Sequence, residues 1–191
     1  IHHTTVAGNE SGQQGGGLWI DGTGDVSIVN STFTGNRVDR DAGGGFTYNG
    51  DGRLTVESCL FAYNEAGRAA GGFWKRPAVE GSVSNSIFAF NVVGDAIGER
   101  HMGPRPDDGG GNIDYAIDEP DKGRAFEGST FADPLLGELT EVNGLLLHPL
   151  LDGSPAIGAA TGSSPDHDAR GAPRDATPDV GPYEHGVDSC R

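Results

Sequence analysis

Residues 33–36 read FTGN, an apolar residue followed three places later by asparagine. The same pattern returns at nearly constant intervals along the first half of the chain. Its four copies are Val6–Asn9, Phe33–Asn36, Phe61–Asn64 and Phe88–Asn91. The asparagines are 27, 28 and 27 residues apart. A fixed period of this length indicates a protein built from stacked structural repeats.

Two further landmarks keep the same period. Runs of glycine precede a large apolar residue at Leu18, Phe46 and Phe73. Short alternating runs, VSIV at 26–29, LTVE at 54–57 and SVSN at 82–85, have the pattern of half-buried strands. Each period therefore contains three strand-like pieces separated by turns.

These periods predict an all-β fold, a right-handed parallel β-helix with three strands per coil and a period of 27 to 28 residues. Successive coils of such a solenoid lie about 4.8 Å apart, so equivalent residues stack on one another. The predicted internal core stack is Val6, Phe33, Phe61 and Phe88. The predicted structural ladder of hydrogen-bonded side chains is Asn9, Asn36, Asn64 and Asn91. We expect coils over residues 1–135 and an irregular C-terminal module over 136–191 that packs on them.

Composition excludes several classes of protein. With 33 Gly and 11 Pro among 191 residues, the chain opposes long helices. The formal net charge of −15 repels nucleic acid and anionic membrane surfaces alike. The longest apolar stretch, residues 144–151, is interrupted by His148 and Pro149 and is too short for a membrane span.

The order of motifs along the chain resembles known bacterial surface proteins. The apolar-x-x-Asn and Gly-rich landmarks resemble the repeats of polymorphic outer membrane proteins and, more broadly, of pectin-lyase-like parallel β-helix proteins. The C-terminal motifs are Asp133–Leu136, Gly153–Ile157, Asp168–Arg174 and Asp179–Glu184. Their order is similar to the terminal module of secreted β-helix proteins labelled choice-of-anchor. The resemblance implies a secreted protein at the cell surface or in the extracellular space.

One interval breaks the period. Phe88 and Phe131 are 43 residues apart, which predicts inserted material with an acidic segment over residues 95–121. Three carboxylates in this segment, Asp107, Asp108 and Asp114, are candidate ligands for Ca²⁺, which takes six to eight oxygen ligands. The alternative is a solvated acidic loop without an ion, because the spacing matches no defined calcium loop.

Catalysis is the less favoured hypothesis. A polysaccharide lyase needs carboxylates and a basic residue on one face, and a glycoside hydrolase needs a close pair of carboxylates. Stacking in register brings no such pair together, so no catalytic residue is predicted. It does predict an edge of possible contacts with an anionic sugar, Arg40, Arg68 and Arg76.

The function favoured by the sequence is that of an extracellular structural or adhesive β-solenoid protein. Strand-like residues from Ile1 to Asn9 predict an open parallel edge, which we expect to pair with another copy or with upstream coils of a longer surface protein. A filament is one outcome of such pairing. The alternative is a protein that binds or cleaves extracellular polysaccharide.

Overall fold

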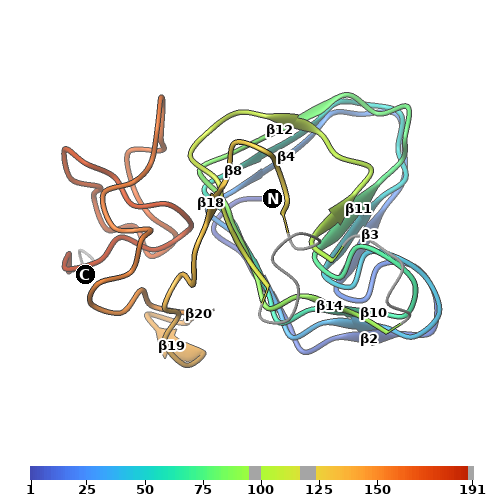
Figure 1. Ribbon diagram of the computed structural model, residues 1–191, viewed down its shortest axis with the longest axis horizontal. Coiled ribbons are helices and arrows are strands. Elements are labelled where there is room, and N and C mark those ends of the chain that lie inside the picture. Colours follow the sequence, from blue (N-terminus) through green and yellow to red (C-terminus); the bar gives the residue numbers. More distant parts are fainter. Residues whose placement is uncertain (95–99, 117–123, 189–191) are drawn as a thin grey trace.

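A computed structural model of the chain describes residues 1–94, 100–116 and 124–188. The described residues form an all-β solenoid of stacked parallel coils, with an irregular segment alongside, so the predicted fold class is confirmed (Figure 1). No helix in these three ranges has the length and hydropathy of a membrane span.

Each coil contributes strands to the same sheets in turn. The largest sheet, here the β1 sheet, has the order β1 (Thr5–Ala7), β5 (Thr32–Thr34), β9 (Leu60–Ala62), β13 (Ile87–Ala89), β17 (Ile113–Tyr115) and β18 (Thr130–Phe131). The β4 sheet contains β4 (Val26–Val29), β8 (Leu54–Glu57), β12 (Gly81–Ser84) and β16 (Asp107–Asp108). The β3 sheet contains β3 (Leu18–Ile20), β7 (Phe46–Tyr48), β11 (Phe73–Lys75) and β15 (Met102–Gly103).

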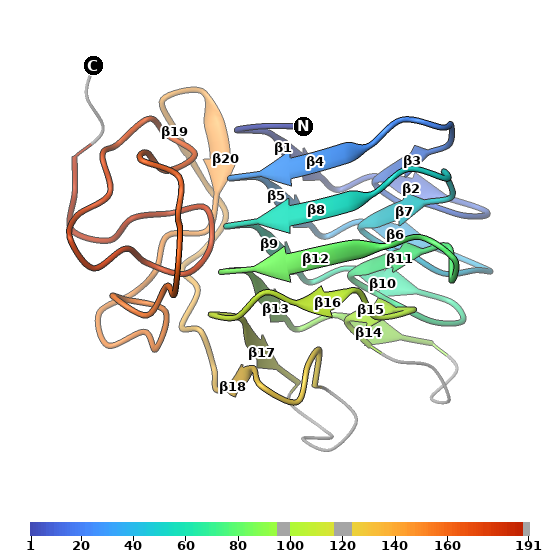
Figure 2. The same cartoon turned by 90° about the horizontal axis from the view of Figure 1, so that it is seen from above.

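A row of two-residue strands completes each coil between the β1 and β3 sheets. These strands are β2 (Glu10–Ser11), β6 (Arg37–Val38), β10 (Glu65–Ala66) and β14 (Val92–Val93). All the strand pairs of the coils are parallel, and the coils lie one above another in Figure 2. Parallel pairing provides hydrogen-bond partners for the backbone N–H and C=O groups, and this supports the fold of a chain that is poor in large apolar residues.

The predicted core stack lies inside the coils. Val6 pairs with Phe33, Phe33 with Phe61 and Phe61 with Phe88 in the register of the β1 sheet. The rings of Phe33 and Phe61 are parallel, with centroids 4.9 Å apart, and those of Phe61 and Phe88 are 5.2 Å apart. The three phenylalanines are completely buried. The column therefore joins successive coils at the spacing of the strands.

The asparagines lie at the turns that follow the first four strands of the β1 sheet. The Asn36 Nδ2 donates to Asn64 Oδ1 at 3.0 Å, and Asn64 Nδ2 donates to Asn91 Oδ1 at 3.0 Å. Each of these oxygens also accepts the backbone N–H of the preceding asparagine. The residue before each asparagine has a left-handed backbone, including Tyr63 and Phe90 with φ of 57° and 56°.

The interval after Phe88 differs from the expected insertion. Phe88 pairs with Asp114, 26 residues later, and Asp114 pairs with Phe131 after a further 17 residues. This corrects the expectation of one 43-residue period, because a coil of ordinary length already ends at Asp114. Part of the proposed acidic segment, residues 95–99 and 117–121, lies outside the described residues.

Asp114 closes this end of the core. Its side chain is fully buried, and its Oδ2 accepts hydrogen bonds from the Ala125 backbone N–H at 2.5 Å and from the Ser129 hydroxyl. Ala125 and Phe126 pack against the apolar core cluster inside the coils. The segment that Asp114 anchors therefore covers the last coil, as the end of a solenoid requires.

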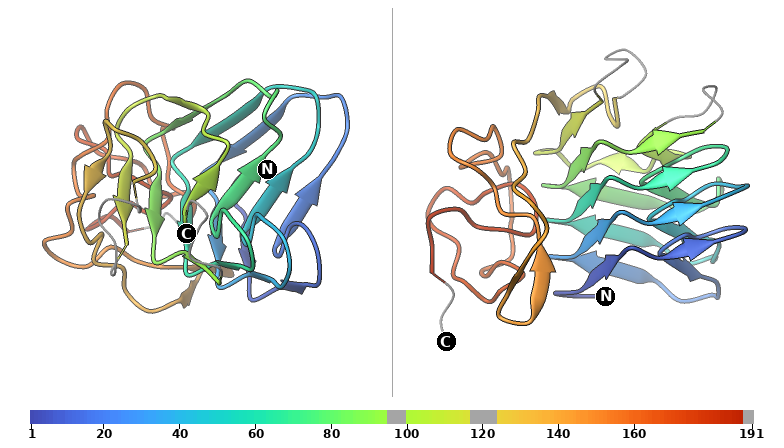
Figure 3. Two further views of the ribbon diagram at one scale, coloured as in Figure 1. Left: turned by 45° about the vertical axis from the view of Figure 1, so that its right-hand side comes forward. Right: turned by 90° about the horizontal axis from the view of Figure 1, so that it is seen from below.

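The C-terminal segment lies along the side of the coils and not over their end (Figures 2 and 3). Its regular element is an antiparallel hairpin of β19 (Thr140–Val142) and β20 (Leu145–Leu147). The Asn30 Nδ2 donates to His167 O at 2.8 Å, and Asn85 Nδ2 donates to Thr161 O at 3.0 Å. Polar turns of separate coils thus hold the segment in place.

Candidate functional site

The candidate site is a groove on the outside of the β3 sheet, beside the loops that lead into its strands. It consists of two adjoining hollows of about 390 and 380 Å³, which share Gln14 and Asp41. We call it the tryptophan groove. Its lining residues are Gln13, Gln14, Trp19, Asp41, Ala42, Arg68, Ala69 and Trp74.

Strand alternation places the two tryptophans on the outer face. Leu18, Phe46 and Phe73 pair in register and pack toward the core, so the next residue of each strand points outward. Trp19 and Trp74 lie in one column on either side of Thr47. Trp19 is 49% exposed, and Trp74 is half-buried.

Between the two indoles, the column has the short side chain of Thr47. Its side chain is buried, and its hydroxyl donates to Ala42 O at 3.2 Å. The tryptophans are therefore separated by two strand spacings, about 10 Å, along the solenoid axis. A ligand lying along the axis meets both aromatic faces with a small side chain between them.

Glycine stacking packs together the loops that carry the lining residues of the groove. A Cβ on Gly44 would lie 2.4 Å from Glu65 O and 2.5 Å from Gly71 O, so these loops touch through their backbones. The preceding position is left-handed in three coils, with φ of 67° at Gly15, 78° at Gly43 and 56° at Ala70. The periodic glycine landmark thus sets the path of the chain around the groove.

The polar side chains of the groove are available to a ligand. Within the described ranges, the side chains of Gln13, Gln14, Asp41 and Arg68 make no hydrogen bond or ion pair with the protein. Together they present carboxylate and amide oxygens as acceptors, and guanidinium and amide N–H groups as donors. An aromatic surface with a few convergent polar groups is typical of a small-molecule binding site.

The structure separates the three arginines proposed as sugar contacts. Arg68 lines the tryptophan groove. Arg40 is exposed, next in sequence to Asp41. Arg76 follows the other end of β11 and forms an ion pair with Asp51. One of the three predicted residues thus belongs to the groove.

The structure does not gather the three proposed calcium ligands. Asp107 and Asp108 are exposed on β16, and Asp108 Oδ1 accepts from Asn112 Nδ2 at 2.8 Å. Asp114 is buried, and its burial raises the pKa of its carboxyl above the ordinary value. The described part of the chain contains no group of three His, Cys, Asp or Glu side chains placed to hold a metal ion. Calcium binding stays a prediction.

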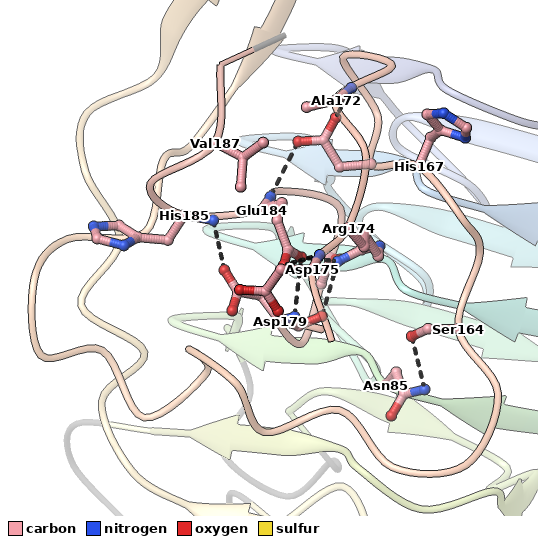
Figure 4. Close-up of polar contacts among 12 residues, drawn as sticks. Asn85, Ser164, His167, Ala172, Arg174, Asp175, Asp179, Glu184, His185 and Val187 are labelled. Carbon is pink, nitrogen blue, oxygen red and sulfur yellow. Dashed lines mark hydrogen bonds and ion pairs between the residues drawn. The ribbon is translucent and has the colours of Figure 1, made fainter. Parts of the chain in front are cut away.

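A second cluster of charged side chains lies inside the C-terminal segment (Figure 4), and its Arg174 also donates to Asn30 Oδ1 in a turn of the coils at 3.1 Å. Arg174 forms a 2.9 Å ion pair with Glu184, and both side chains are almost completely buried. Glu184 Oε2 also accepts the Asp179 backbone N–H, and Asp179 in turn accepts from Gly158 and His185. The C-terminal sequence motifs therefore supply an internal ionic network and not an open site.

The tryptophans were missed as functional residues by sequence reasoning, although the signal was present. In GGGLW at 15–19 and GGFW at 71–74, each tryptophan directly follows the residue predicted to point inward. Strand alternation alone places it on the surface. An outward-facing tryptophan at one position of two coils indicates a candidate binding surface.

Comparison with protein-family models, with curated proteins and with solved structures gives no match for this chain. The assignment of function therefore rests on the geometry of the groove.

Proposed function

We propose that the chain is a polysaccharide-binding β-solenoid of the adhesive kind, with the tryptophan groove as its binding surface. The observation that carries the proposal is the pair of outward-facing indoles, Trp19 and Trp74, next to polar groups without protein partners. A sugar ring has an apolar face of C–H groups and a rim of hydroxyls. The apolar face packs on an aromatic surface, and the hydroxyls need hydrogen-bond donors and acceptors.

Binding fits the groove better than cleavage. Glycosidases use two carboxyl groups, about 5 to 9.5 Å apart, on either side of the bond that breaks. Among the described lining residues of the groove, Asp41 is the single carboxylate. The proposed activity is accordingly retention of a glycan without chemical change.

The sequence resemblance supports an extracellular setting for this activity. The repeats resemble those of polymorphic outer membrane proteins, and the C-terminal motifs resemble the choice-of-anchor module. A solenoid at the cell surface that binds polysaccharide holds a cell to a glycan-coated surface or to its own matrix.

Binding assays with paired variants test the proposal. We expect Trp19→Ala and Trp74→Ala each to weaken glycan binding by about tenfold or more, because aromatic anchors dominate binding surfaces. Leu151→Ala is the matched control, since Leu151 is 49% exposed, as Trp19 is, and lies in the C-terminal segment. Binding should be measured by calorimetry against a panel of soluble polysaccharides. Absence of binding to every polysaccharide would contradict the proposal.

Association of coils is a second candidate function. Strands β1, β2 and β3 are each the outermost strand of a sheet, and residues 1–3 pair with the end of β4, so the first coil presents a parallel edge along the axis. An edge of this kind pairs with further strands. The proposed partner is another copy of the chain or other coils of a longer surface protein.

A further inference from the structure

We infer that the tryptophan groove takes an uncharged glycan, with the sugar chain lying along the solenoid axis. This inference rests on the proposed function and adds the class of polysaccharide and its direction. Two independent features carry it, the balance of charge in the groove and the placement of its two aromatic rings.

The charge balance of the groove favours an uncharged ligand. Its lining contains one acidic side chain, Asp41, and one basic side chain, Arg68, together with two neutral amides, Gln13 and Gln14. Sites that bind carboxylate or sulfate groups need a surplus of cationic donors. The whole chain carries −15, which lowers the local concentration of a polyanion near any face of the protein.

The polar groups of the groove match neighbouring hydroxyls. The Asp41 carboxylate accepts hydrogen bonds, the Arg68 guanidinium donates them, and the Gln14 amide does both. A hydroxyl is a donor and an acceptor at once, so a pair of adjacent hydroxyls engages groups of both kinds. An acidic sugar would instead place its carboxylate near Asp41 and meet repulsion.

The positions of the aromatic rings determine the direction of the bound sugar chain. Trp19 and Trp74 belong to strands β3 and β11, which are separated by β7 along the axis. Their separation of about 10 Å is that of two strand spacings. A glycan placed across the coils would contact one indole, whereas a glycan along the axis contacts both.

Intrinsic fluorescence gives a direct measurement, because Trp19 and Trp74 are the two tryptophans of the chain and both line the groove. The probes are cello-oligosaccharides and manno-oligosaccharides as neutral glycans, and oligogalacturonates as acidic ones. We expect a saturable change in emission with a neutral series, and affinity at least about tenfold lower for the acidic series. Equal or stronger binding of oligogalacturonate would overturn the inference while leaving the proposed function in place.

Charge variants separate recognition of charge from simple packing. Asp41→Lys gives the groove a surplus of two cationic groups, and we expect it to reverse the preference toward oligogalacturonate. Asp41→Asn leaves a surplus of one cationic group, so we expect a smaller preference for neutral glycan, intermediate between those of the unaltered chain and of Asp41→Lys. If Asp41→Lys left the ratio of the two affinities unchanged, the charge argument would be overturned. Circular dichroism of each variant verifies that the fold is retained.

The dependence of affinity on oligosaccharide length tests whether the sugar chain lies along the solenoid axis. For the unaltered chain, we expect affinity to rise about tenfold from disaccharide to hexasaccharide, as the ligand comes to span both indoles. Trp19→Thr and Trp74→Thr should each abolish most of this rise, because one aromatic contact remains. A length dependence that is the same in the single variants and the unaltered chain would overturn the axial placement. Failure of every neutral and acidic glycan to bind would overturn the proposed function itself.

Discussion

At the scale of single residues, the asparagine ladder joins coils through side chains of which three, Asn36, Asn64 and Asn91, are buried. Asn64 is the central member, because it donates to Asn91 Oδ1 and to Phe33 O and accepts from Asn36. Its amide thus engages three coils. Removal of this amide leaves buried backbone and side-chain groups without partners.

We therefore expect Asn64→Ala to lower the free energy of unfolding by about 1 to 3 kcal/mol. Asn9→Ala is the control, because Asn9 is exposed and lies at the end of the ladder, where water replaces the lost contacts. Urea denaturation of both variants measures the difference. Equal losses for the two would contradict a structural role for the buried ladder.

His148 gives stability a dependence on pH. Its Nδ1 donates to Gly137 O at 2.8 Å, its Nε2 lies 3.0 Å from Thr34 Oγ1, and its ring contacts Tyr63. Burial lowers the pKa of the imidazole below its ordinary value. The folded state thus binds this proton less readily than the unfolded state, so the contribution to stability is complete above about pH 6.5 and declines as pH falls.

We expect unfolding free energies measured between pH 8 and pH 5 to fall more for the unaltered chain than for His148→Gln. Burial raises the pKa of Asp114 and Asp179, so the contribution of these two carboxyls to stability increases as pH falls. This increase is the same in both proteins, so the difference between the two pH profiles reports His148 alone. Parallel pH profiles for the two proteins would contradict the assignment.

At the scale of elements, the glycine loops show how tightly neighbouring coils are stacked. We expect Gly44→Ala to destabilise the chain by about 1 to 3 kcal/mol, because its Cβ would overlap backbone oxygens that cannot move away separately. Gly12→Ala is the matched control, since no atom lies within 4 Å of a Cβ at that site. Thermal unfolding of the pair measures the effect, and equal melting temperatures would argue against close stacking.

The repeating elements could be predicted from the sequence because stacking aligns equivalent residues, so Phe61 and Asn64 recur at a fixed period. Prediction failed where no period exists. The side position of residues 132–188 depends on turns such as Asn85, which repeat analysis does not distinguish from other polar turns. Asp114 occupies a position of the core column, but its side chain is polar, and this concealed the coil that ends there.

The tryptophan groove was partly hidden for a similar reason. Repeat analysis finds what the coils share, whereas Trp19 and Trp74 occupy a position where the intervening coil has Thr47. Arg68 was predicted as a sugar contact from its column alone. Its proximity to the tryptophans follows from the loop path, which short-range patterns do not give.

At the scale of the whole molecule, the net charge opposes the proposed association of copies. The chain carries −15, so separate copies repel one another over a Debye length of about 10 Å at 0.1 M salt. If coils associate through the edge of the first coil, we expect larger species to increase with ionic strength. Sedimentation velocity over a salt series measures this, and monomers at every concentration and ionic strength would contradict association by the edge.

The lateral position of the C-terminal segment has a mechanical consequence. A bare solenoid pulled at one end can peel away coil by coil, because each coil is held by its nearest neighbours. Here His3 in the first coil contacts Ala169, while Asn85, three coils farther on, binds Thr161. The C-terminal segment is therefore bonded to several coils at once and connects them along the side of the solenoid. Tensile load at the first coil is shared with later ones, which would suit the proposed adhesive function.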